Sequence, residues 1–207
     1  MTLPIVVADT SVLINFLKID RMDLIGRYPG RLLATDHVQS ELADDYPEQR
    51  LRYEAAVTGG LLDTCSVTDP AEVSLFGRLG PGVRLGAGEC SAIAVALSRG
   101  FAIANDDNRA IKIALREAEL AGKRLIVLRT QDIVVALIRA SVLTVEEAGR
   151  VKAEWEQRHR FRLKVRSFQD LLASSLSGMG SHNAPLLGQP WLPTSSCFFV
   201  RLTTRSR

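Results

Sequence analysis

The stretch IVVAD at residues 5–9 places an aspartate directly after four apolar residues, and FAIAND at residues 101–106 repeats the arrangement with one asparagine before the aspartate. Short runs that are apolar throughout are typical of strands buried on both faces of a parallel sheet. A carboxylate beside such a strand costs free energy unless something positive compensates for it. We therefore expect Asp9 and Asp106 to have a cation as partner.

Further apolar runs extend this pattern into an α/β fold. Runs at residues 31–34, 61–67 and 125–128 alternate with segments of helical period. This alternation predicts a three-layer α/β/α architecture with a central parallel sheet and helices on either side. Helix starts are predicted from Asp36, Gly88, Asn108 and the capping-box spacing at Thr144, with helices at 37–44, 89–99, 109–121 and 145–159.

The length of 207 residues suits one domain with appended segments. We predict an α/β domain at residues 1–140, a helical extension packed on it at 141–173, and a flexible or disordered tail at 174–207 that is rich in Gly, Pro and Ser. The three excess basic residues all follow Leu171, so net charge does not by itself indicate a nucleic-acid partner.

Cysteine content and hydropathy exclude several classes of protein. The three cysteines are widely spaced and lack the motifs of disulfide frameworks or zinc sites. No apolar run approaches the roughly 18 residues that a membrane-spanning helix needs. These features predict a cytoplasmic protein without a membrane segment.

Two further acids join the strand-end aspartates. Glu89 begins a predicted helix whose apolar stripe starts at Ala92 and Ile93, so its side chain faces the sheet. Glu41 lies near the apolar side of a shorter helix, next to Leu42. Because the carboxyl ends of parallel strands gather ligands, four carboxylates converge on one sheet edge. Such oxygen donors suit Mg²⁺ or Mn²⁺, and the cluster fits phosphodiester hydrolysis.

Three stretches together resemble the signatures of PIN-domain nucleases: VVADTSVLI at residues 6–14, LGAGECSAIA at 85–94, and IANDDNR at 103–109. The resemblance covers roughly residues 3–140. Within the family, the short single-domain form is similar to the VapC-type toxins of toxin–antitoxin pairs. It implies a PIN-like fold, a Mg²⁺- or Mn²⁺-dependent endoribonuclease, an RNA substrate and an antitoxin protein as partner, with homodimer formation as a further expectation.

The resemblance also implies roles for individual residues. Asp9, Glu41, Glu89 and Asp106 would be the catalytic, metal-binding acids, and Thr10 or Ser11 would orient Asp9 or hydrogen-bond the waters of the metal. Asp107 is adjacent to Asp106, so either can be the fourth ligand, although strand geometry favours Asp106. We do not assign His37 or Asn15 to the site.

Basic residues supply candidate contacts to RNA. Three basic residues share one face of the helix that follows Asp106 and are therefore favoured for binding RNA: Arg109, Lys112 and Arg116. The segment 150–166 carries seven basic residues, but a solvated helix face explains it more simply. The alternative hypothesis is a non-catalytic PIN-like module that binds RNA or protein. A phosphotransferase using Asp9 as nucleophile is weakly supported, since Ser11 stands where the haloacid-dehalogenase type has a second aspartate.

Overall fold

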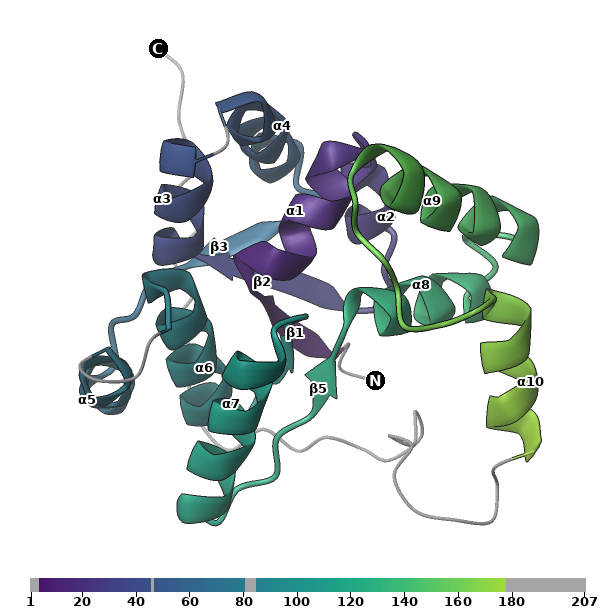
Figure 1. Ribbon diagram of the computed structural model, residues 1–207. Helices are drawn as coiled ribbons and strands as arrows, with labels where there is room; N and C mark the ends of the chain where they lie inside the picture. The colour runs from purple at the N-terminus through teal and green to yellow at the C-terminus, as the bar shows by residue number, and fades with distance from the viewer. Residues whose placement is uncertain (1–3, 46, 81–84, 178–207) are drawn as a thin grey trace.

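The computed structural model describes residues 4–45, 47–80 and 85–177, so most of the predicted tail lies outside the described residues. Five strands form one sheet (Figure 1). They are β1 (Ile5–Ala8), β2 (Arg31–Thr35), β3 (Asp63–Cys65), β4 (Ala102–Ala104) and β5 (Val127–Leu128). The described helices are α1 (Thr10–Lys18), α2 (Met22–Gly26), α3 (Asp36–Asp45), α4 (Pro47–Thr58), α5 (Pro70–Leu79), α6 (Ala87–Arg99), α7 (Asn108–Leu120), α8 (Thr130–Arg139), α9 (Val145–Arg158) and α10 (Phe168–Ser177).

The sheet has the order β3-β2-β1-β4-β5, and every neighbouring pair is parallel. Val6 of β1 pairs with Leu32 of β2 on one side and with Ala102 of β4 on the other. The strand order therefore reverses at β1, and the connections leave to opposite sides of it. In open α/β sheets, ligands bind at such a switch point, outside the carboxyl ends of the strands.

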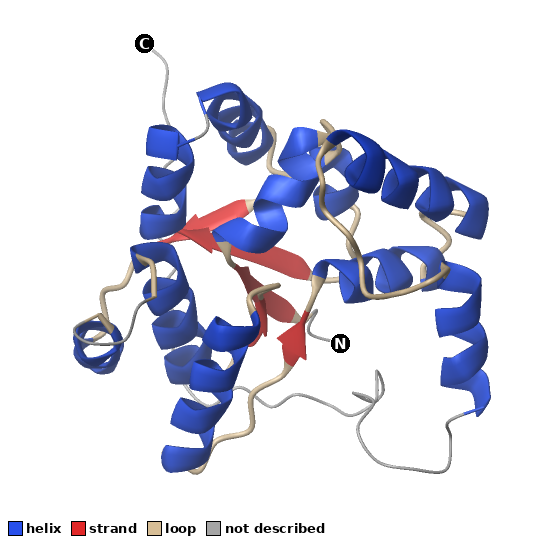
Figure 2. Ribbon diagram, in the orientation of Figure 1, coloured by secondary structure: helices blue, strands red, loops and turns tan. Residues whose placement is uncertain are grey.

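Helices cover both faces of the sheet, so the predicted three-layer α/β/α fold is confirmed (Figure 2). Val6 and Ala8 pack into a core with residues of α1, α2, α4, α8 and α9, whereas Val7 packs into a second core with α5, α6 and α7. All three side chains are buried. The strand is apolar throughout because its alternate residues enter two different cores.

The helix starts agree with the sequence prediction to within a few residues. The capping box at Thr144 is confirmed, because its hydroxyl accepts from the Glu147 N–H at 3.1 Å. Three details differ from the predictions. Asp36 is the first residue of α3 instead of its cap, Gly86 caps α6 in place of Gly88, and the cap of α7 is Asp107, not Asn108.

The C-terminal helices share the core of the sheet domain. Trp155 of α9 is fully buried, packs edge-on against Phe16 of α1 at 5.4 Å, and donates its Nε1–H to the Asn15 carbonyl at 2.7 Å. Phe168 at the start of α10 is 2% exposed within the same core. Residues 145–172 are thus tied to α1, the helix that follows the first site aspartate. None of the helices in the described part of the chain is long and apolar enough to cross a bilayer.

Candidate active site at the carboxyl edge of the sheet

Three neighbouring strands deliver polar residues to the same edge. Asp9 directly follows β1, Asn105 and Asp106 follow β4, and Thr130 opens α8 two residues after β5. The Asp9 N–H donates to the Ala104 carbonyl at 2.9 Å, so the ends of β1 and β4 remain paired up to the first aspartate. The polar residues at this edge are therefore fixed by the sheet itself.

Asp9 is the most unusual of these residues because its carboxylate is 1% exposed. Its Oδ2 accepts from the Ser11 N–H at 3.0 Å and caps α1, but its buried Oδ1 has no hydrogen-bond partner among the described residues. Burial raises the pKa of Asp9 to about 6, hydrogen bonding from Ser11 offsets part of this rise, and the charges of Glu89 and Glu41 add to it. Among the described residues, Asp9 thus forms no ion pair with a basic side chain.

Glu41 and Glu89 approach the same point from two helices. The Glu41 carboxylate on α3 accepts from the Thr10 hydroxyl and from the Gly88 N–H, both at 2.7 Å. Glu89 in the first turn of α6 accepts from the Gly86 N–H at 2.9 Å. Burial raises the pKa of Glu89, and the charges of Asp107 and Glu41 raise it further. These carboxylates lie close enough to repel one another, as expected where a cation normally stands between them.

Asp106 has a different environment, in which protein donors surround its carboxylate. Oδ1 accepts from the Thr130 N–H at 3.0 Å, and Oδ2 accepts from the Thr130 hydroxyl at 2.5 Å and from Asn15 Nδ2 at 3.0 Å. Burial still raises the pKa of Asp106, but the Thr130 bonds and the Arg129 charge oppose the rise. The first turn of α8 therefore compensates much of this charge.

Asp107 is exposed, and its Oδ1 caps α7 by accepting from the N–H groups of Arg109 and Ala110 at 2.7 and 2.9 Å. Its charge also acts on Glu89, which places it on the Glu89 side of the site. Asn105 directly follows β4, and its Oδ1 accepts from the Asp107 N–H at 2.7 Å. Its buried Nδ2 has no partner among the described residues.

The two hydroxyls after Asp9 are used separately. Thr10 donates to Glu41, whereas the Ser11 hydroxyl accepts from the Asp106 N–H at 3.1 Å. Thr10 and Ser11 thus connect α1 to the other acidic elements. Hydrogen bonding from both the side chain and the backbone of Ser11 lowers the pKa of Asp9. That one of the two hydroxyls orients Asp9 or hydrogen-bonds the waters of a metal stays a prediction.

Sequence reasoning missed the residues that arrange the acids. Asn15 was set aside, yet its Nδ2 also donates to the Ser11 carbonyl and to Thr130 Oγ1, at 2.9 and 3.1 Å. The sequence patterns indicate no role at the site for Thr130, and for Gly88 they indicate only the start of a helix. A threonine two residues after the last apolar run is the one signal that points to Thr130. His37 instead lies against Phe76, at 4.6 Å between ring centroids, and contacts Asp36.

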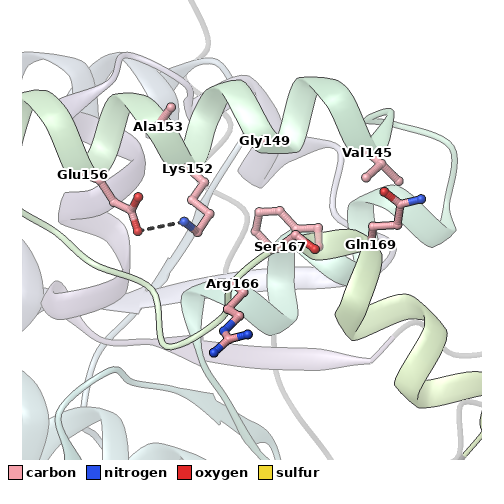
Figure 3. A pocket seen from close by; sticks show the side chains of 9 residues that line it. Val145, Gly149, Lys152, Ala153, Glu156, Arg166, Ser167 and Gln169 are labelled. Atoms are coloured by element: carbon pink, nitrogen blue, oxygen red, sulfur yellow. Dashed lines mark ion pairs between the residues drawn. The ribbon is translucent and has the colours of Figure 1, made fainter.

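Two regions of the chain are rich in basic residues, and the surroundings of these residues differ. Arg109, Lys112 and Arg116 are exposed on α7, and the charge of Arg109 acts on Glu89. In the 150–166 segment, Lys152 pairs with Glu156 at 2.9 Å. That pair lines a pocket of about 220 Å³ between α9 and residues 166–169 (Figure 3), which is separate from the acidic edge. The pocket lining contains no Asp, His or Cys.

The acidic residues at this edge match a divalent cation in their donor chemistry more closely than in their spacing. In the conformation seen, no three Asp, Glu, His or Cys side chains of the described residues are gathered tightly enough to enclose one ion. The unpartnered, buried Oδ1 of Asp9 nevertheless fits a cation, because an ionised oxygen in that position needs a positive ligand. Oxygen donors of this kind suit Mg²⁺ or Mn²⁺.

The parallel sheet with acidic residues at its switch point places the chain among open α/β domains that bind ligands at this edge. The family model of the PIN domain matches residues 5–172, and the chain therefore belongs to the PIN-domain family. The match extends through the C-terminal helices α8 and α9 and into α10. PIN domains are in general nucleases and typically use divalent metal ions. A search of curated proteins finds no match.

Proposed function

We propose that the protein is a Mg²⁺- or Mn²⁺-dependent endoribonuclease that hydrolyses RNA phosphodiester bonds. The observation that carries this proposal is Asp9, whose buried Oδ1 has no partner in the described part of the chain while Glu41 and Glu89 add negative charge around it. A module that only binds RNA gains nothing from uncompensated carboxylates facing phosphates. The family supports nuclease chemistry in general.

In the proposed mechanism, acidic side chains hold the metal ion and basic side chains hold the RNA. Asp9 and Glu89 hold the cation together with Asp106 or Asp107, and Glu41 completes the acidic site. When bound, Mg²⁺ or Mn²⁺ supplies positive charge that makes water easier to deprotonate and stabilises the charge developing on the phosphate. The exposed Arg109, Lys112 and Arg116 on α7 hold the RNA backbone beside the acids.

We further propose that this nuclease is the toxin of a toxin–antitoxin pair and is held inactive by a small protein partner. The support is the resemblance of its short single-domain form to VapC-type toxins. Induced expression is then expected to arrest growth of a bacterial host, and Asp9→Asn is expected to relieve the arrest. Growth arrest of equal strength by both forms would remove the support for a toxin that acts through RNA cleavage.

The nuclease is tested with labelled RNA in the presence of EDTA, Mg²⁺ or Mn²⁺. Cleavage is expected only with the metal, and Asp9→Asn or Glu89→Gln is expected to lower its rate by about a hundredfold or more. Even residues that merely support metal ligands contribute about 10- to 100-fold. Glu154→Gln is the matched control, because Glu154 lies on α9 and pairs at 3.5 Å with the exposed Arg158.

Calorimetric titration with Mn²⁺ separates the nuclease from the alternative, a non-catalytic module that binds RNA or protein. The nuclease predicts uptake by the wild-type protein and by Glu154→Gln, with a loss in Asp9→Asn. RNA binding without Mn²⁺ uptake and without cleavage would establish the binding module instead. Wild-type cleavage rates in both purified acid variants would refute the mechanism.

A further inference from the structure

The Glu41 carboxylate is held by two groups from other helices. Its Oε2 accepts from the Thr10 hydroxyl at the start of α1, and its Oε1 accepts from the Gly88 N–H in the first turn of α6, both at 2.7 Å. Backbone N–H groups in the first turn have no partner within the helix, and the helix dipole favours an anion there. Glu41 thus docks α3 on the start of α6.

Gly88 and Gly86 leave the space that this carboxylate occupies. A Cβ atom at position 88 would lie 2.8 Å from Glu41 Cδ and 3.0 Å from its Oε1. At position 86 it would lie 2.7 Å from Oε1. Neither glycine has a positive φ, so the backbone conformation does not require glycine at either position. The requirement comes from Glu41.

The carbonyl group of Gly88 is also held in place by a hydrogen bond. Its carbonyl accepts from the Ser91 hydroxyl at 2.8 Å, and the Ser91 hydroxyl lies 2.6 Å from that of Thr35. Both hydroxyl-bearing side chains are fully buried, and Thr35 directly precedes α3, the helix that carries Glu41. The first turn of α6 is therefore held against the start of α3, and Gly88 cannot simply move away from a new side chain.

We propose that Gly88, assisted by Gly86, is a positioning residue that seats the Glu41 carboxylate on the first turn of α6. The seat itself is independent of any reaction. Its catalytic consequence rests on the proposed nuclease function, in which Glu41 must face Asp9 and Glu89 in a fixed orientation.

A side chain at position 88 is expected to displace the Glu41 carboxylate more than it disturbs the fold. A methyl group at position 88 meets the end of a flexible glutamate side chain, which can rotate away at low cost. Alanine also has a higher helix propensity than glycine, which favours the variant. Gly88→Ala is therefore expected to fold, because the gain in helix propensity offsets part of the cost when Glu41 loses its hydrogen bond to position 88.

Amide hydrogen exchange at position 88, measured by NMR on the metal-free full chain, tests the seat directly. This N–H bonds Glu41 instead of a helix carbonyl, so its protection reports that contact. Relative to intrinsic exchange rates, exchange is expected to rise about tenfold or more in Glu41→Ala and in Gly88→Ala, as loss of a charge-assisted hydrogen bond implies. Unchanged exchange in both variants would overturn the proposal.

Gly149→Ala is the matched control, because Gly149 lies within α9 and a Cβ there has no neighbour within 4 Å. It is expected to leave both the exchange at position 88 and the rate of RNA cleavage unchanged. A rise in exchange at position 88 in this control as large as in Gly88→Ala would mean that the effect is not specific to the seat, and would overturn the proposal.

A double-mutant cycle then tests the consequence for the reaction. Gly88→Ala is expected to slow RNA cleavage about 10- to 100-fold in the wild-type background, and to have no further effect in Glu41→Ala, where no carboxylate remains to be displaced. Equal losses in the two backgrounds would refute positioning through Glu41. If the wild-type protein cleaves no RNA, the proposed function fails, while the exchange measurement still decides whether the seat exists.

Discussion

Asp9 and Asp106 occupy equivalent places in the fold but have opposite surroundings. Each follows a buried strand, β1 or β4, and these strands are neighbours in the sheet. Burial raises the pKa of both carboxyls. Within the described residues, Asp106 receives three hydrogen bonds from Thr130 and Asn15, whereas Asp9 is hydrogen-bonded by Ser11 alone and keeps a buried oxygen without a partner.

The difference separates two ways of stabilising a buried negative charge. Around Asp106 the compensation is built from the protein: the first turn of α8, the Asn15 amide and the nearby Arg129 charge. Around Asp9 the nearby charges of Glu89 and Glu41 are also negative, so the described residues leave this carboxylate uncompensated, and the proposed cation would supply the missing positive charge. Sequence position alone does not distinguish these cases, because both aspartates end apolar strands.

The largest expected effect of the difference is on the pH dependence of stability without metal. The folded protein holds the Asp9 proton up to a pKa of about 6, whereas the unfolded chain loses it near 3.8. Stability is therefore lost as pH rises from about 4 to 6, by about 3 kcal/mol for a shift of about two units. Asp9→Asn is expected to reduce this loss and to unfold at higher urea concentration than wild type at pH 7 in EDTA.

Two observations complete that test. Glu89 and Asp106 also have raised pKa values, so a smaller loss with the same sign should remain in the variant. Mn²⁺ at pH 7 is expected to stabilise the wild-type protein and not Asp9→Asn. If Asp9→Asn is less stable than wild type in EDTA at pH 7, then Asp9 is compensated within the protein after all and the comparison with Asp106 fails.

The second-largest expected effect concerns Asp106, whose charge is compensated by the protein. Thr130→Val removes one hydrogen-bond donor to this carboxylate. The buried carboxylate then loses its 2.5 Å bond to the hydroxyl and keeps those from the Thr130 N–H and Asn15. We expect a loss of about 2 kcal/mol in the free energy of unfolding, measured by urea denaturation at pH 7.

Thr64→Val provides the matched control for the loss of a threonine hydroxyl. Thr64 is exposed on the edge strand β3, where a β-branched residue is readily accommodated. Its effect is expected to stay within about 0.5 kcal/mol of wild type. Equal effects of the two substitutions would mean that the Thr130 hydroxyl does not compensate Asp106.

Strands and helix caps that depend on residues adjacent in the sequence were predictable from the sequence. The apolar run at residues 5–8 indicates a strand buried on both faces, and β1 has those bounds. The Thr144 capping box is a pattern of four consecutive residues, and it is present. In these cases, local backbone chemistry decides the structure.

The partners of the acids were not predictable in this way. Asp106 is separated from Asn15 by 91 residues and from Thr130 by 24, and Glu41 is 47 residues from Gly88. These pairs meet only after the sheet has brought the strand ends together, and neither an asparagine within a helix nor a glycine before a glutamate carries a local signature of its partner. The sequence therefore indicates which carboxylates gather, but not which of them are compensated.

The smallest expected effect concerns Asp107, the second candidate for the fourth ligand. Asp107→Asn removes its charge but retains the cap on α7, since asparagine and aspartate are similarly good N-caps. Stability at pH 7 is expected to stay within about 0.5 kcal/mol of wild type. Because the charge of Asp107 acts on Glu89 from an exposed position, Mn²⁺ affinity measured by calorimetry is expected to fall only about two- to fivefold. A loss as large as in Asp9→Asn would instead identify Asp107 as a direct ligand, leaving Asp106 as the carboxylate that Thr130 and Asn15 neutralise within the protein.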